Sequence, residues 1–162
     1  MSDVSVLFVC LGNICRSPTA DGLFQKLVAD AGLSARIAID SAGTGAWHAG
    51  EPPDKRMTAH AKKRGIDLTR LRARQAKAED FRRFDWILAM DHDNLQNLQR
   101  LDPGDGQARL HLMGEFSSDH GGSPPPVPDP YYGGAAGFET VLDMLEDACA
   151  NLLAKLREEH GL

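Results

Sequence analysis

Short apolar runs alternate with amphipathic stretches along the chain. Residues 4–9 form an apolar run rich in β-branched side chains, which is typical of a strand buried in a parallel sheet. From residue 20 to residue 31 apolar side chains recur at helical spacing, and Gly32 follows them as a typical helix end. Ser17 and Pro18 precede this stretch, so we predict that the helix begins there with the Ser17 hydroxyl as its N-cap.

The same alternation continues toward the C-terminus. It predicts strands over 36–41, 85–90 and 109–113, and helices over 54–64 and 91–101. A last helix carries its apolar side chains, from Phe138 to Leu156, on one face. Residues 121–134 are rich in Ser, Gly and Pro and are predicted to form a loop.

Strands that alternate with helices in this way indicate β-α-β units. We therefore expect an α/β fold with one domain over residues 1–162. Its core should be a four-stranded, twisted, parallel sheet flanked by helices on both faces. In such sheets ligands bind at the carboxyl ends of the strands. The turn that follows the first strand is therefore the place to search for chemistry.

The composition argues against several classes of protein. The 162 residues carry a net charge of −5, and the first apolar run is far shorter than the ~20 residues of a membrane-spanning helix. A secretory signal is not expected either, because the N-terminus carries an acidic residue early rather than a basic one. The odd number of cysteines, three, predicts no disulfide framework and a reducing, cytoplasmic compartment. Scattered histidines and the missing CxxC pattern predict no metal site.

Basic side chains are concentrated in one stretch. Between residues 55 and 83 there are eleven Lys and Arg against three Asp and Glu. Such a stretch can attract nucleic acid, an anionic surface or acidic substrates. It lacks the aromatic interleaving that stacks bases. We therefore predict a solvated surface and no nucleic-acid partner.

The segment from Cys10 to Ser17 combines a potential nucleophile with a phosphate-binding side chain. Cys10 and Arg16 are separated by five residues, between the end of the first strand and the start of the first helix. A turn in that place can direct its backbone N–H groups inward and, with the positive end of the helix dipole, form an anion site. Gly12 and Asn13 tolerate the positive φ that such a turn needs. The Arg16 guanidinium matches two phosphate oxygens, and the same field favours the thiolate form of Cys10.

Phosphoryl transfer through Cys10 also needs an acid for the leaving group. In this scheme the thiolate attacks phosphorus and forms a cysteinyl-phosphate, while Ser17 donates a hydrogen bond to the sulfur. The best acid is Asp129, because prolines on both sides stiffen its position in the late loop. Tyr131 and Tyr132 follow it, and we expect them to form an apolar wall for an aromatic ring. The residues predict a phosphatase that acts on phosphotyrosine.

Four motifs resemble those of the low-molecular-weight protein tyrosine phosphatases, and together they extend over nearly the whole chain. They are CLGNICRSP at residues 10–18, SAGTGAWH at 41–48, ARQ at 73–75 and DPYYGG at 129–134. The first and last of these are highly specific when they occur together. The resemblance implies a four-stranded parallel sheet flanked by helices, in agreement with the pattern above.

The resemblance also implies roles for individual residues. Cys10 would be the nucleophile, Arg16 the phosphate ligand and Asp129 the general acid. Phosphate binding or loop support is implied for Leu11, Gly12, Asn13, Ile14, Cys15, Ser17 and Ser41, and substrate recognition for Trp47, Tyr131 and Tyr132. The reaction would need no metal and no cofactor. We expect a monomer whose partner is a phosphotyrosine-containing protein.

Two positions of the chain depart from the family pattern or allow two interpretations. The family often has a histidine four residues before the Gln of ARQ, but here that position is Leu71, which cannot form hydrogen bonds. The network that supports the loop must therefore end earlier or include water. Eukaryotic relatives can join a cysteine at the position of Cys15 to the nucleophile in a reversible disulfide. A small buried side chain that fills space is the alternative. Cys149, on the apolar face of the last helix, is predicted to be inert.

Three other functions compete with this prediction. An arsenate reductase shares the loop but needs two further cysteines, and residues 81–93 contain none. A phosphoarginine phosphatase of the same family has Thr at the position of Ile14 and lacks the paired tyrosines. A phosphate-binding module that has lost catalysis would not need the complete set of catalytic groups present here.

Overall fold

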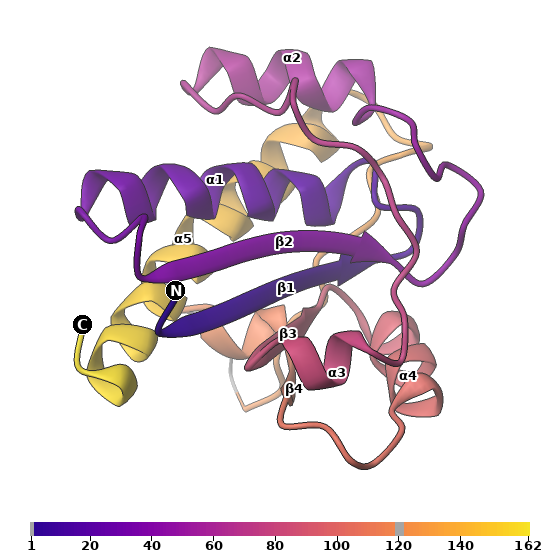
Figure 1. The fold of residues 1–162 in the computed structure, drawn as a ribbon. Coiled ribbons are helices and arrows are strands. Elements are labelled where there is room, and N and C mark those ends of the chain that lie inside the picture. The colour runs from indigo at the N-terminus through magenta and orange to yellow at the C-terminus, as the bar shows by residue number, and fades with distance from the viewer. Residues whose placement is uncertain (1, 119–121) are drawn as a thin grey trace.

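The computed structural model describes residues 2–118 and 122–162 and contains a sheet of four parallel strands. In spatial order the strands are β2 (Ile37–Gly43), β1 (Val4–Cys10), β3 (Trp86–Ala89) and β4 (Arg109–Leu112). Because β1 has β2 on one side and β3 on the other, the strand order reverses at its carboxyl end (Figure 1). Such a reversal opens the crevice in which doubly wound sheets bind ligands. Cys10, the last residue of β1, lies at this crevice.

Helices cover both faces of the sheet (Figure 1). One face is covered by α1 (Arg16–Asp30) and α5 (Ala135–His160), and α2 (Lys55–Lys63) packs against α5 on the same side. The other face is covered by α3 (Asp80–Arg83) and α4 (His92–Leu101). A short 3₁₀ helix, η1 (Met113–Phe116), directly follows β4. Among the residues that the structure describes, no helix has the length and apolar character that a membrane span requires.

The central strand β1 supplies side chains to two cores, because successive residues of a strand point to opposite faces. Val6 and Phe8 pack into the larger core with α1 and α5, whereas Leu7 and Val9 pack into the smaller core with α3 and α4. All four side chains are fully buried. Burial on both faces explains why this strand reads as an apolar run rather than as an alternating pattern.

The expected fold class is confirmed, and each predicted strand and helix is present within a few residues of its predicted ends. Two short elements, α3 and η1, are absent from the prediction. Four residues each are too few to reveal a helical period in the sequence. Residues 122–134 of the predicted late loop contain no helix or strand, and residue 121 lies outside the described residues.

The basic stretch at residues 55–83 is partly neutralised by ion pairs. Four of its arginines pair with carboxylates: Arg56 with Asp54, Arg64 with Glu139, Arg74 with Asp80 and Arg82 with Asp105. Guanidinium groups that are already paired are poor candidates for phosphate contacts along a nucleic acid. This pattern fits a solvated protein surface.

Candidate active site

The Cys10 loop, residues 10–17, connects the end of β1 with the start of α1. Cys10 is 2% exposed, and its Sγ lies 3.0 Å from the Oγ of Ser17. The prediction that Ser17 caps the helix is wrong, because α1 begins at Arg16 and the N-cap position belongs to Cys15, without a side-chain hydrogen bond. The tertiary fold brings the Ser17 hydroxyl to the Cys10 sulfur instead.

The backbone of the Cys10 loop leaves several N–H groups without a protein partner. Its carbonyl oxygens accept hydrogen bonds from outside the loop: Cys10 from Thr44 (2.9 Å), Leu11 from Gly45 (2.9 Å) and Ile14 from Asp54 (2.8 Å). In the part of the chain that the structure describes, the N–H groups of residues 12–15 donate to no protein acceptor. Four successive N–H groups without a protein acceptor at a helix start indicate a site for an anion.

Asn13 makes the curl of the loop possible. Its φ of 58° is the only positive value at a non-glycine residue within the described chain, and Asn tolerates this conformation better than most residues. Its Nδ2 donates to the Oγ of Ser17 at 2.7 Å, and its Oδ1 accepts the N–H of Arg74 at 3.0 Å. The end of β2 approaches so closely that a Cβ at Gly43 would stand 2.7 Å from the Leu11 carbonyl oxygen. Only glycine fits at that position.

Arg16 is buried at the start of α1 and lines the same cavity as Cys10. Its Nη1 donates to Asp91 Oδ2 at 2.6 Å and to the Val127 carbonyl at 3.1 Å, and its Nη2 lies 3.7 Å from Asp129 Oδ2. Burial alone would lower the pKa of Arg16, but the charge on Cys10 and the two carboxylates raise it above its usual value. Arg16 therefore remains a cation beside the predicted nucleophile.

Asp91 is a site residue that the sequence analysis does not single out. It lies just beyond the carboxyl end of β3, next to the end of β1. One carboxylate oxygen accepts from Arg16, and the other accepts the N–H of Asn94 at 2.8 Å and so caps α4. The signal that could find it is positional, since ligand-binding residues gather where neighbouring parallel strands end.

The Cys10 loop forms part of the wall of a cavity of about 370 Å³. The residues that line it are Cys10, Leu11, Gly12, Ile14, Cys15, Arg16, Trp47, His48, Asp129, Tyr131 and Tyr132. Trp47 and Tyr132 are 71% and 94% exposed, and the rings of Tyr131 and Tyr132 meet edge to face. The three predicted catalytic residues and the three predicted recognition residues therefore surround one cavity.

His48 is a second residue of the cavity that the sequence analysis does not single out. Its Nδ1 lies 2.5 Å from Glu51 Oε2, and its ring centre is 6.3 Å from that of Tyr131. A lone histidine in a glycine-rich loop has no spacing that would mark it. Within the described residues, no group of three or more His, Cys, Asp or Glu side chains is placed to hold a metal ion.

The segment that carries Asp129 is tied to the start of α2. Asp129 Oδ1 accepts the N–H of Tyr131 at 3.0 Å, and the Tyr131 carbonyl accepts from Arg56 Nη2 at 2.9 Å. Arg56 also pairs with Asp54, the N-cap of α2. Because the Asp54 N–H binds the Ile14 carbonyl, the same helix start contacts the Cys10 loop. These contacts place the Asp129 carboxylate beside Arg16.

Three other residues from the sequence analysis lie at or near the loop. Ser41 has its hydroxyl beside Asp21 and, within the described chain, no hydrogen bond to the Cys10 loop, so its supporting role stays a prediction. Leu71 packs against the larger core. Cys15 is a free thiol, 4% exposed, and burial raises its pKa. A buried, protonated thiol fits the space-filling alternative for Cys15.

Asp21 is a buried carboxyl group in α1, one turn after Ser17. It is 1% exposed, and Gln25 Nε2 donates to its Oδ1 at 2.6 Å. Burial raises the pKa of Asp21 from 3.8 to about 6, and hydrogen bonds from Gln25 and Ser41 offset only part of this rise. The folded protein therefore holds this proton more tightly than the unfolded chain does.

We expect the Asp21 carboxyl group to make folding stability depend on pH. A raised pKa in the folded state means that its stabilisation is complete below about pH 4 and is lost as the pH rises through about 6. The shift of about two units corresponds to about 3 kcal/mol. Relative to that of the wild type, the free energy of unfolding of Asp21→Asn, measured with urea, should therefore rise by about that amount between pH 4 and pH 7. Asp30→Asn, at the exposed end of α1, is the control. The same dependence of unfolding free energy on pH in Asp21→Asn and in the wild type would contradict the prediction.

The sequence matches the family described as low molecular weight phosphotyrosine protein phosphatase over residues 5–161. It is 50% identical over 157 residues to a putative low molecular weight protein-tyrosine-phosphatase of Synechocystis, covering 96% of this chain and 98% of that one. A low molecular weight phosphotyrosine protein phosphatase of Schizosaccharomyces pombe is 47% identical over 155 residues, covering 95% and 97%.

The chain is also similar to solved structures over nearly its whole length. A protein tyrosine phosphatase of Entamoeba histolytica matches with a TM-score of 0.90 and 42% identity, covering 96% of this chain and 98% of that one. A Drosophila arginine phosphatase matches with a TM-score of 0.86 and 31% identity, covering 94% and 97%.

Proposed function

The chain belongs to the low molecular weight phosphotyrosine protein phosphatase family, and from this premise we propose that it hydrolyses phosphotyrosine on proteins with Cys10, Arg16 and Asp129 as its catalytic residues. Membership of the family makes it a protein tyrosine phosphatase. The roles of the individual side chains are the substance of the proposal.

In the first step the Cys10 thiolate attacks phosphorus. An S–P bond forms, the bond between phosphorus and the tyrosine oxygen breaks, and Asp129 gives its proton to the leaving oxygen. The N–H groups of residues 12–15 and the Arg16 guanidinium donate to the equatorial oxygens of phosphorus. These donors stabilise the charge that spreads over those oxygens in the transition state.

In the second step the Asp129 carboxylate takes a proton from a water molecule, whose oxygen attacks phosphorus. The S–P bond breaks, and inorganic phosphate and the Cys10 thiolate are released. The Ser17 hydroxyl, 3.0 Å from the sulfur, stabilises the departing thiolate by donating its hydrogen.

The observation that carries the proposal is the set of unpaired N–H groups at residues 12–15, beside the cavity that Cys10 and Arg16 line. Hydrogen-bond donors without a protein acceptor, placed beside a buried guanidinium, are suited to an anion. A bound phosphate group would accept hydrogen bonds from these donors.

The rim of the cavity favours an aromatic ester. Trp47, Tyr131 and Tyr132 stand at its mouth, and Leu11 is 40% exposed. Ile14, 9% exposed, presents an apolar side chain where phosphoarginine phosphatases have Thr. These features support phosphotyrosine over phosphoarginine, although a Drosophila arginine phosphatase shares the fold.

The substrate class is tested with matched peptides. We expect kcat/KM for a phosphotyrosine peptide to exceed that for a phosphoarginine peptide of the same sequence at least ~100-fold. Excess EDTA should leave the rate unchanged, and vanadate should inhibit competitively. Faster turnover of the phosphoarginine peptide would overturn the substrate class. Arsenate reduction coupled to thioredoxin oxidation would overturn the reaction class.

We expect Asp91→Asn to lower kcat/KM for p-nitrophenyl phosphate about tenfold. The neutral amide holds the Arg16 fork less firmly in the orientation that binds two phosphate oxygens. Asn keeps the size of the side chain and an oxygen that can cap α4, so stability should change little. The control Asp93→Asn removes the same charge from the exposed first turn of α4. Equal kcat/KM values for the two variants would count against the role of Asp91.

We further propose that the protein is a cytoplasmic monomer whose partner is a phosphotyrosine protein. The three free cysteines support a reducing compartment. Sedimentation of the purified protein tests the monomer, and an apparent mass near 35 kDa, about twice that of the chain, would contradict it.

A further inference from the structure

We propose that Arg74 is a positioning residue for the Cys10 loop, because its side chain is clamped by Asp40 and Asp80 and thereby holds its own backbone N–H against Asn13. The proposal rests on the function proposed above. In this proposal, one cluster of ion pairs at the edge of the sheet supports the loop that holds the nucleophile.

Asn13 is the point at which the Cys10 loop needs external support. Its positive φ is a sparsely populated conformation for a residue with a side chain, so the surroundings must hold it in place. Both ends of its amide group are used: Oδ1 accepts the Arg74 N–H at 3.0 Å, and Nδ2 donates to Ser17 Oγ at 2.7 Å. Ser17 Oγ in turn contacts the Cys10 sulfur at 3.0 Å. A displacement of the Arg74 backbone would therefore reach the Cys10 sulfur through the side chains of Asn13 and Ser17.

The Arg74 carbonyl and the backbone that follows it are attached to the end of β2. The Gly43 N–H donates to the Arg74 carbonyl at 2.8 Å, and the Ala76 N–H donates to the Gly43 carbonyl at 2.7 Å. Gln75 Nε2 also donates to the Thr44 carbonyl at 3.2 Å. This short bridge, between Gly43 and Gln75, extends the edge of the sheet by only one pair of residues.

Before Arg74, the Ala73 N–H donates to the Glu51 carbonyl at 2.9 Å, and the Ala73 carbonyl accepts the Gly50 N–H at 2.8 Å. These backbone bonds attach the segment to β2 and to residues 50–51, whereas its attachment to α3 depends on side chains.

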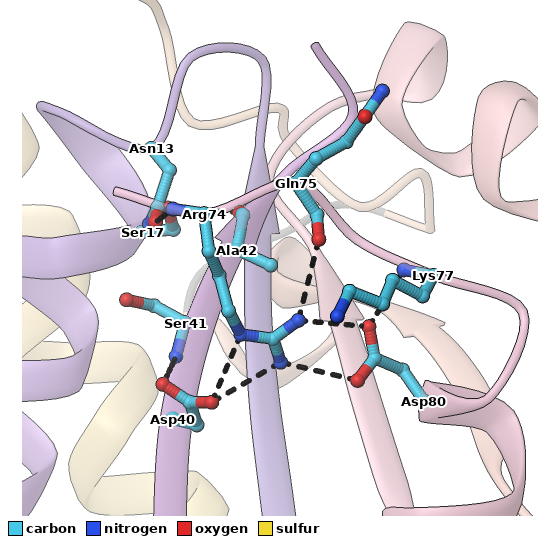
Figure 2. Close-up of polar contacts among 9 residues, drawn as sticks. All are labelled: Asn13, Ser17, Asp40, Ser41, Ala42, Arg74, Gln75, Lys77 and Asp80. Carbon is cyan, nitrogen blue, oxygen red and sulfur yellow. Dashed lines mark hydrogen bonds and ion pairs between the residues drawn. The ribbon is translucent and has the colours of Figure 1, made fainter. Parts of the chain in front are cut away.

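The Arg74 side chain supplies the further attachment that this bridge lacks (Figure 2). Its Nε donates to Asp40 Oδ2 at 3.1 Å, and its two terminal nitrogens each donate to Asp80 at 3.1 Å. Asp80 is 2% exposed, and it also accepts the Lys77 N–H at 2.8 Å. Burial alone would lower the pKa of Arg74, but hydrogen bonds and charge from Asp80 and Asp40 raise it. The guanidinium thus joins β2 to the start of α3.

Leu71, three residues before Arg74, packs against the larger core, and its apolar side chain can form no hydrogen bond to the loop. In the described chain the Oδ1 of Asn13 receives its hydrogen bond from the Arg74 backbone. The clamp on Arg74 therefore limits how far that donor can move.

The test removes the clamp and leaves the backbone donor in place. We expect Arg74→Met to lower kcat for p-nitrophenyl phosphate about 10- to 100-fold, because the N–H groups of the loop no longer meet the equatorial oxygens in the transition state. The inhibition constant of vanadate, which resembles that state, should rise by a similar factor. KM should change less than kcat. Arg74→Lys, which can keep one ion pair, should recover part of the loss.

Arg72→Met is the matched control. Arg72 lies two residues away and is exposed, and among the described residues it donates only to the carbonyls of Thr69 and Leu71. It should keep wild-type kcat and wild-type vanadate inhibition. Asp40→Asn leaves the ion pair between Arg74 and the buried Asp80 intact, and it should also lower kcat, by a few-fold. This variant keeps the test open if Arg74→Met does not fold.

A lower melting temperature for Arg74→Met, with unchanged kcat and vanadate inhibition of the folded enzyme, would overturn the proposal and leave Arg74 a purely structural role. Calorimetry measures vanadate binding to the wild type and to the variant without requiring hydrolysis. It therefore distinguishes failure of this proposal from failure of the proposed function. If the wild type binds vanadate but hydrolyses no ester, the phosphatase assignment fails. The effect of Arg74 on the anion site would then still be measured.

Discussion

Cys10→Ser should abolish turnover, with the rate of p-nitrophenyl phosphate hydrolysis falling at least ~10⁴-fold. The hydroxyl group is nearly the same size as the thiol, but it is not ionised near neutral pH and is a far weaker nucleophile. Cys10 is 2% exposed and contacts Ser17, so the smaller oxygen leaves the loop folded. Inorganic phosphate should still bind within a few-fold of its wild-type affinity, because the backbone donors and Arg16 remain.

Cys149→Ala is the control for the loss of a thiol. Cys149 is fully buried in α5, away from the cavity lining, so its replacement should lower stability slightly and leave kcat unchanged. The labelled phosphoenzyme expected after rapid acid quench of the wild type should be absent from Cys10→Ser. Substantial activity in Cys10→Ser would refute the cysteinyl-phosphate.

Asp129→Asn should lower kcat/KM for phenyl phosphate about 10²- to 10⁴-fold, which is the range that general acid catalysis contributes. Phenolate is a poor leaving group and needs the proton that the amide cannot give. The carboxylate stands 3.7 Å from Arg16 and accepts the Tyr131 N–H, a contact that an amide oxygen can also make. The loop should therefore keep its shape.

The leaving group provides the internal control for Asp129. p-Nitrophenolate leaves without full protonation, so Asp129→Asn should slow hydrolysis of p-nitrophenyl phosphate much less than that of phenyl phosphate. A series of substituted phenyl phosphates measures the dependence of kcat/KM on leaving-group pKa, which should steepen in the variant. An equal loss for every ester would assign Asp129 a binding role instead.

Local sequence pattern was sufficient for the main elements of the fold. The apolar run at residues 4–9 reflects burial of a strand, and the helical spacing from 20 to 31 reflects burial of one helix face. Both produce a pattern among residues that are close in the sequence. The ends of elements were less predictable. Ser17 has the residue type of an N-cap, yet its hydroxyl contacts the Cys10 sulfur within the same loop and donates to the Ala42 carbonyl of β2 instead.

The candidate site divides in the same way. Cys10, Asn13 and Arg16 could be found together because one short turn holds them all. Asp129 could be found because prolines mark its position. Asp91 carried only a positional signal, its place after a buried strand, because no neighbour in the sequence distinguishes this acid from other helix caps. The contact of Arg74 with Asn13 joins residues 61 positions apart, and no local pattern encodes it.

The sequence by itself determined the fold class and the residue types of the candidate site: a thiol and a guanidinium at one β-α turn, with an acid between prolines later in the chain. The tertiary structure alone decided which distant groups hold that turn in its working shape, namely Asp91 on Arg16 and the clamped Arg74 on Asn13. The reason is physical. Chemistry depends on residue types and their local backbone, whereas orientation depends on groups that meet only after the strands have aligned in the sheet.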